Sequence, residues 1–145
     1  MASSGAGAGQ TTGPRASQDA ASVISKPSPR SVSETVQRFT EMVQAKGVEV
    51  FAVIDHSAEA ARVGLELRDT KLVIFGSPKA GTPAMVAAPL AALDLPLKIL
   101  VWDDGGQTRV SYTSPAALAA RNGLSDELAA PLAVIGPLTD ALVQP

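Results

Sequence analysis

The chain has 145 residues, of which 46% are hydrophobic and 18% charged, with no cysteine, one histidine and a formal net charge of −2. The length suits one domain with its own core, and the lack of cysteine excludes disulfides, thiolate catalysis and cysteine-bound metals. Twelve basic against fourteen acidic residues give no positive field for nucleic acid. No apolar run reaches the roughly 18–20 residues of a membrane span. We therefore expect neither a nucleic-acid partner nor membrane contact.

Residues 1–18 differ in composition from the rest of the chain. They are mainly glycine, alanine, serine and threonine, with Arg15 as their one charge and no large apolar side chain. Such a segment cannot bury enough surface to offset its ordering entropy, which predicts a disordered tail before a single domain over residues 19–145. The basic start and apolar stretch of a secretory signal are absent, so we expect a cytoplasmic location. A native tail and an expression leader both fit this segment.

The domain is expected to begin with a strand and a capped helix. A short apolar run over Ala20–Ser25 ends at Lys26-Pro27, which favours an edge strand because proline cannot donate to a sheet ladder. Ser31, with Glu34 three residues later, is typical of a capping box. A helix over residues 33–46 follows from it.

Two strands and a short helix come next. Val48–Ile54 alternates and is β-branched, which predicts a strand. The strand ends in Asp55-His56, after which Ser57 is expected to cap a short helix over residues 58–63. The unbroken apolar run Lys71–Phe75 suits a central strand that is covered on both faces.

A helical connection and a hairpin are expected to complete the sheet. Thr82-Pro83 favours a helix start with proline at its first position, and Pro89 should end or bend that helix. The segments Leu97–Trp102 and Gln107–Tyr112 flank the turn Asp103–Gly106 and form the clearest hairpin in the chain.

Helical segments follow the hairpin. Ser114-Pro115 starts a helix that Asn122-Gly123 ends, and Ser125 starts another that Pro131 and Gly136-Pro137 interrupt. Hairpin-linked strands with helices in the long connections predict an α+β fold with a largely antiparallel sheet.

The ordered set of short motifs resembles the domain-of-unknown-function 302 (DUF302) family. The motifs are Ser33–Val36, Val50-Phe51, Ile54–His56, Ala61, Gly64-Leu65, Leu72–Pro78, Gly81-Thr82 and Ala92–Lys98. The resemblance runs from about Ser31 to Leu142. It implies a β-α-β(4)-α domain of the TATA-binding-protein-like class, with helices on one face of the sheet, usually a self-associating dimer in bacteria. The resemblance implies no established reaction. The name of the fold class does not imply DNA binding, because function depends on the site and not on the fold.

Asp55 and His56 are the first candidate site. They follow a strand end, where side chains often reach a cleft, and an imidazole beside a carboxylate can act as a general base near neutral pH. In the structural alternative, Asp55 or Ser57 caps the next helix and His56 hydrogen-bonds locally.

The loop Gly76–Thr82 is the second candidate site. Free backbone N–H groups at Thr82 and beyond, with Lys79 nearby, could hold an anion at the start of a helix. Ser77 stands where many DUF302 members carry asparagine. The loop lacks the spacing of a Walker loop, and an ordinary strand-to-helix connection is the alternative.

Lys98 is the third candidate. It shares a strand face with Leu100 and Trp102, so its stem is expected to be buried. It could clamp an anion, act as an amine of lowered pKa, or form a structural ion pair with Asp55 or Asp94.

Two classes of function follow. The first is a non-catalytic module that self-associates and binds a protein or a small, anionic ligand, and its candidate ligand-binding residues are Asp55, His56, Gly76, Ser77, Thr82 and Lys98. The second is a small enzyme with His56 as acid/base, in which Lys98 and the Gly76–Thr82 loop hold an anionic substrate. We expect no metal site and no cofactor, because one histidine and three methionines make a poor ligand set.

A homodimer is the expected assembly. Met85, Val86 and Leu90 form an apolar face in a connection that one sheet will not fully cover. Burial against a second copy, most simply by a two-fold contact, would remove this face from water.

Overall fold

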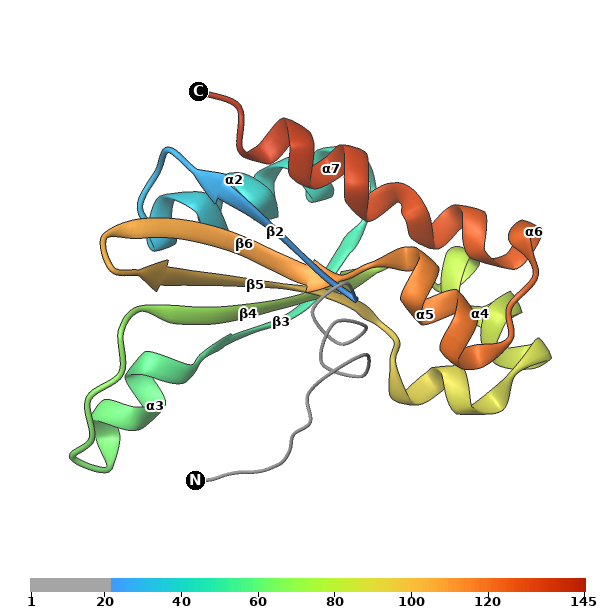
Figure 1. Ribbon diagram of the computed structural model, residues 1–145, viewed down its shortest axis with the longest axis horizontal. Helices are drawn as coiled ribbons and strands as arrows, with labels where there is room; N and C mark the ends of the chain where they lie inside the picture. Colours follow the sequence, from blue (N-terminus) through green and yellow to red (C-terminus); the bar gives the residue numbers. More distant parts are fainter. Residues whose placement is uncertain (1–21) are drawn as a thin grey trace, which may run out of the picture.

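The computed structural model describes residues 22–145 as a five-stranded antiparallel sheet with helices on one face and at one end (Figure 1). In chain order the elements are β2 (Val23–Ser28), α2 (Val32–Ala45), β3 (Glu49–Asp55), α3 (His56–Arg62), β4 (Thr70–Gly76), α4 (Pro78–Ala87), η1 (Pro89–Leu93), β5 (Leu97–Asp104), β6 (Gln107–Thr113), α5 (Pro115–Asn122), α6 (Asp126–Ala129), η2 (Ala130–Val134) and α7 (Ile135–Leu142). The predicted tail, and the first two residues of the predicted edge strand, lie outside the described residues.

The strand order is β2-β6-β5-β4-β3, and every neighbouring pair is antiparallel. This confirms the predicted α+β fold. The predicted hairpin is β5–β6, whose turn carries Gly105 and Gly106 at φ 60° and 98°, conformations that favour glycine. The predicted edge strand is β2, which continues through Lys26 and Pro27 to Ser28. Proline is tolerated there because an edge strand has one side free of ladder hydrogen bonds.

Two helices, α2 and α7, lie side by side over one face of the sheet (Figure 1). The predicted capping box starts α2: Ser31 Oγ accepts from the Glu34 N–H at 3.1 Å, and the Glu34 carboxylate accepts from the Ser31 N–H at 3.2 Å. Phe39 of α2 meets Phe75 of β4 edge to face, with ring centroids 4.8 Å apart. The buried core under these helices is Val32, Val36, Phe39, Val43, Val73, Phe75, Ile99, Val101, Val110, Tyr112, Ile135, Leu138 and Leu142.

A second, smaller core lies beyond one end of the sheet, where α4, η1, α5 and η2 meet (Figure 1). Its buried residues are Ala84, Ala91, Leu95, Leu118 and Leu132. The small side chains of Ala84 and Ala91 let the short helices approach closely. None of the buried residues of this smaller core lies in a strand.

Two predicted helix starts were wrong. The helix α4 begins at Pro78, not at Thr82-Pro83, because Pro78 occupies the first helical position after Ser77 and Pro83 is carried inside the helix. The helix α3 begins at His56, not at residue 58, because Asp55, the other of the two possible caps, is its N-cap and accepts from the Ala58 N–H at 2.9 Å.

Two further expectations need correction. The strand β4 is fully covered on one face only: Val73 and Phe75 are buried, whereas Leu72 and Ile74 on the other face remain half-buried. The predicted interruption at Pro131 is present as the 3₁₀ turn η2, but Gly136-Pro137 interrupts nothing. This pair lies in the first turn of α7, where a missing N–H removes no helical hydrogen bond.

Candidate functional site

The candidate residues of the first two sites lie at opposite ends of β4. Asp55 is paired with Lys71 at the start of β4, whereas Gly76 is its last residue. The five steps along the strand from Lys71 to Gly76 span about 17 Å at the rise of a strand. The structure therefore does not bring His56 together with the Gly76–Thr82 loop.

Asp55 is held by the start of α3. Its Oδ1 accepts from Ser57 Oγ at 2.6 Å and from the Ala58 N–H at 2.9 Å, and Lys71 Nζ lies 3.8 Å from Oδ2. The hydrogen bond from Ser57, followed by that from the Ala58 backbone, lowers the pKa of Asp55 from its usual 3.8. His56 is exposed and has no hydrogen-bond or ion-pair partner among residues 22–145. The geometry is that of the structural alternative, a capped helix.

Lys98 forms no ion pair with Asp55 or Asp94. Its Nζ donates to the Asp94 backbone carbonyl at 3.3 Å, while the Asp94 carboxylate accepts from Arg121 and Asn122, each at 2.8 Å. Lys98 lines a small cavity of about 70 Å³ that does not include the Gly76–Thr82 loop. The three groups of the enzyme hypothesis, His56, Lys98 and the Gly76–Thr82 loop, therefore do not share one site.

The backbone around Thr82 offers few free N–H groups to the expected anion. Thr82 is the fifth residue of α4, beyond the first turn whose N–H groups lack helical partners. Within that turn, Pro78 has no N–H, and the N–H groups of Ala80 and Gly81 already donate to Ser77 O at 2.9 and 3.0 Å. Little is left there to hold an anion.

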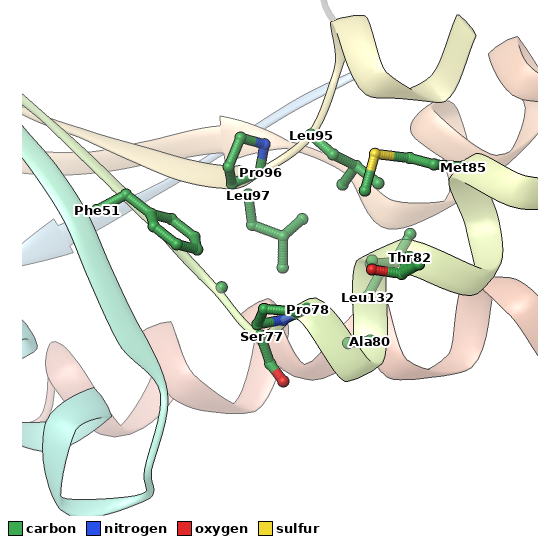
Figure 2. Close-up of a pocket in the computed structure, with 12 residues that line it drawn as sticks. Phe51, Ser77, Pro78, Ala80, Thr82, Met85, Leu95, Pro96, Leu97 and Leu132 are labelled. Carbon is green, nitrogen blue, oxygen red and sulfur yellow. The ribbon is translucent and has the colours of Figure 1, made fainter. Parts of the chain in front are cut away.

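The loop instead forms one wall of an apolar pocket of about 170 Å³ between the ends of β4 and β5 and the helix α4 (Figure 2). The lining residues are Phe51, Gly76, Ser77, Pro78, Ala80, Gly81, Thr82, Met85, Leu95, Pro96, Leu97 and Leu132. Sequence reasoning found three of them, Gly76, Ser77 and Thr82, but assigned them to an anion. The run of small residues from Gly76 to Gly81 was the available indication of space.

Two glycines keep the walls of this apolar pocket close together. A Cβ on Gly76 would lie 3.6 Å from Phe51 Cε2 and 3.7 Å from Pro96 Cβ. A Cβ on Gly81 would lie 3.7 Å from Met85 Cε and 3.8 Å from Leu95 Cδ1. Anything larger than a methyl group at Gly81 would therefore have to displace the opposite wall or occupy the pocket.

The only side-chain polar atoms among the lining residues are two hydroxyls. Figure 2 shows the Thr82 hydroxyl on the side of its helix that faces the pocket, whereas the Ser77 hydroxyl points away. No ionisable side chain lines the pocket. The pocket can therefore bind an apolar group next to one hydrogen-bonding hydroxyl, but it holds no acid, base or ion clamp.

The described residues contain neither a cluster of metal ligands nor a membrane-spanning helix. Within residues 22–145, no three or more histidine, aspartate and glutamate side chains cluster as metal ligands would. No helix there combines the length and the apolar character that crossing a bilayer requires.

The comparison with known families decides the affiliation of this fold. The family described as "Domain of unknown function DUF302" matches residues 24–142. The chain belongs to the DUF302 family. A crystal structure of an uncharacterized conserved DUF302 protein from Bacillus stearothermophilus is similar at a TM-score of 0.71 and 18% identity, covering 84% of this chain and 95% of that one. That likeness, at low identity, concerns the fold alone.

Curated relatives of this DUF302 chain carry the name of an ion channel. The chain is 38% identical over 126 residues to fluoride-specific ion channel FluC 1 of Brucella suis biovar 1, a match that covers 85% of this chain and 50% of that protein. FluC 1 of Brucella abortus and FluC 2 of Brucella melitensis match at the same identity, over 47% of their length. The chain thus spans about half the length of the curated relatives it matches.

Proposed function

We propose that this DUF302 domain is a non-catalytic module that binds a small apolar molecule, or the apolar part of one, in the pocket beside α4. The observation that carries the proposal is the pocket itself, about 170 Å³ and lined mainly by carbon. Concave, mostly apolar sites with a few polar groups are the usual form of small-molecule sites.

Non-catalytic binding fits the distribution of ionisable groups. A general acid or base must come within about 3 Å of the proton that it transfers. No ionisable side chain lines the apolar pocket, and His56 lies at the far end of β4. Binding needs only the apolar walls and the Thr82 hydroxyl.

The size of the pocket suggests the size of the ligand. Apolar cavities of about 150 Å³ lined by leucine, isoleucine and phenylalanine bind benzene. A pocket of about 170 Å³ beside one hydroxyl would therefore accept a single ring, with a hydrogen-bonding substituent directed at Thr82.

Ligand-induced thermal stabilisation of the full chain tests the proposal, with benzene and phenol as probes. Both probes should raise the melting temperature by several degrees, because a ligand that binds only the folded state stabilises it. Gly81→Leu should abolish the shift by filling the pocket. Gly136→Leu is the matched control, since this helical glycine also lacks a side chain but faces open space. No shift in the wild type, or equal shifts in both variants, would contradict the proposal.

Self-association is a second part of the proposal. Val86 and Leu90 are 77% and 74% exposed, and this exposure supports burial against another copy, whereas Met85 of the expected apolar face lines the pocket instead. Light scattering after size exclusion should give about twice the 14.8 kDa of one chain. A mass that stays at 14.8 kDa on concentrating would contradict self-association. The cytoplasmic location and the absence of nucleic-acid and membrane partners remain predictions.

The named relatives favour a second candidate function, action alongside a fluoride channel. Its support is that 85% of this chain matches about half of each of three such proteins. In the Brucella suis protein, deletion of the matched half should lower fluoride resistance, and replacement of that half by this chain should restore it. Unchanged resistance after the deletion would dismiss this candidate.

A further inference from the structure

An arm, defined here as residues 56–69, connects β3 to β4 and projects beyond the sheet (Figure 1). It consists of α3 and the segment that returns to β4. Three apolar side chains of the returning segment are strongly exposed: Val63 at 69%, Leu65 at 65% and Leu67 at 49%. Alternating apolar residues in the open favour contact with another surface.

The backbone of the arm is only partly paired between Leu65 and Asp69. The Leu65 N–H donates to Ala60 O, and Asp69 O accepts from the Asp103 N–H, each at 2.9 Å. Between them, within the described part of the chain, Glu66–Arg68 make no backbone-to-backbone hydrogen bond, and the Arg68 carbonyl accepts from the Thr70 hydroxyl at 2.7 Å. Unpaired backbone groups in a non-helical segment can receive a strand from another chain.

Two charges in the returning segment of the arm have no ion-pair partner among the described residues. Glu66 and Arg68 are both exposed, and neither has an ion-pair partner among residues 22–145. By contrast, Glu59 and Arg62 on α3 form their own pair at 2.9 Å. Two opposite free charges therefore flank Leu67.

We propose that the arm pairs antiparallel with the arm of a second copy, with Leu67 opposite Leu67 of the partner subunit. In that register Glu66 lies opposite Arg68 of the partner subunit, and two-fold symmetry repeats the ion pair. Strand alternation places Leu65 and Leu67 of both copies on one face of the paired segment, together with Asp69, and Glu66 and Arg68 on the other. This inference rests on the self-association proposed above, but it places the two-fold contact at the arm instead of at Val86 and Leu90. It does not depend on the apolar pocket.

The sequence of the arm selects this register. Centring the two-fold axis on Glu66 sets two carboxylates opposite each other, and centring it on Arg68 sets two guanidinium groups together. An axis between Glu66 and Leu67 sets Leu67 opposite Glu66 and Leu65 opposite Arg68. The axis at Leu67 pairs Glu66 with Arg68 twice and Leu67 with itself, and it sets Leu65 opposite Asp69. The complementarity is therefore that of the three central residues.

A charge swap on the full chain tests the pairing by sedimentation velocity from micromolar to millimolar concentration. Glu66→Arg and Arg68→Glu should each raise the Kd of the dimer about tenfold, because each variant places like charges opposite each other at two symmetric positions. The double variant E66R/R68E should return the Kd to near that of the wild type. Glu41→Arg, at an exposed position on α2, is the matched control and should leave the Kd unchanged.

The outcomes separate this proposal from the preceding one. A wild type that stays monomeric at every concentration overturns both the arm pairing and self-association. A dimer that survives both single variants, or that dissociates only with Leu90→Asp, overturns the arm pairing and keeps self-association. Loss of dimer in the single variants with recovery in the double variant supports the pairing. Benzene binding should be the same in all these variants.

Discussion

Lys26 shows how one side chain can join the first strand to the last helix. Its Nζ lies 2.8 Å from the Asp140 carboxylate, donates to Thr139 Oγ1 at 2.7 Å and to Gly136 O at 3.1 Å, and sits over the Tyr112 ring. Burial alone would lower the pKa of Lys26, but its interactions with Asp140 and Tyr112 raise it above 10.5 overall. The charged form is thus favoured by folding.

The raised pKa of Lys26 predicts a loss of stability in alkali. A group whose pKa is higher in the folded state contributes fully below its unfolded pKa, and the contribution disappears as pH rises through the folded value. Lys26→Met should lower the free energy of unfolding by about 1–2 kcal/mol at neutral pH and flatten its decline above pH 10.5. Urea unfolding across this range measures both effects. Lys79→Met, at an exposed position, should change neither, and an unaltered alkaline slope in Lys26→Met would refute the assignment.

The neighbouring Asp55 and His56 make opposite predictions. Asp55→Ala removes the cap of α3 and should lower the free energy of unfolding by about 1 kcal/mol. His56→Ala removes no contact and should change the free energy of unfolding by no more than about 0.5 kcal/mol. Because the pKa of Asp55 is lowered, its contribution exists above pH 3.8 and fades as pH falls through the folded value. Chemical denaturation between acid and neutral pH checks this. Equal losses of stability in the two variants would show that the helix cap does not account for the effect of Asp55→Ala.

At the scale of elements, local chemistry made most of the sheet and its first helix predictable. The capping box at Ser31 and Glu34 and the double-glycine turn of β5–β6 each permit essentially one structure. The start of α4 was ambiguous because Pro78 and Pro83 can each occupy the first position of a helix. In the structure, Ala84 of α4 packs with Leu95 in the smaller core, a tertiary contact that no local signal contains.

The apolar pocket was only partly predictable for a related reason. Its walls come from β3, β4, α4, β5 and η2, so residues as far apart in sequence as Phe51 and Leu132 share it. Periodicity assigns a residue to a face, but it does not show which loops meet at the end of a sheet. The candidates His56 and Lys98 failed to converge with Thr82 because chemical type was the only guide to their grouping.

At the scale of the whole molecule, the two cores should respond differently to a cavity. Leu132 of the smaller core lines the pocket, whereas Leu142 belongs to the main core. Truncation of either leucine to alanine should lower the free energy of unfolding by about 2–5 kcal/mol. Toluene should stabilise Leu132→Ala more than it stabilises the wild type or Leu142→Ala, since only the cavity left by Leu132 enlarges the pocket. Thermal unfolding with and without toluene measures this, and equal rescue of Leu142→Ala would contradict it.

The ion pair between Lys26 and Asp140 also affects how the chain can fold during translation. A ribosome delivers β2 first, yet its ladder partner β6 ends only at Thr113, and the contacts of Lys26 with α7 span 110 and 113 positions in sequence. Distant contacts of this kind delay folding, because a long loop must close before any of them forms. During translation, β2 emerges without its neighbour and must wait until α7, more than 100 positions later, has also left the exit tunnel. A chaperone that shields β2 would therefore act on the nascent chain until α7 has been synthesised.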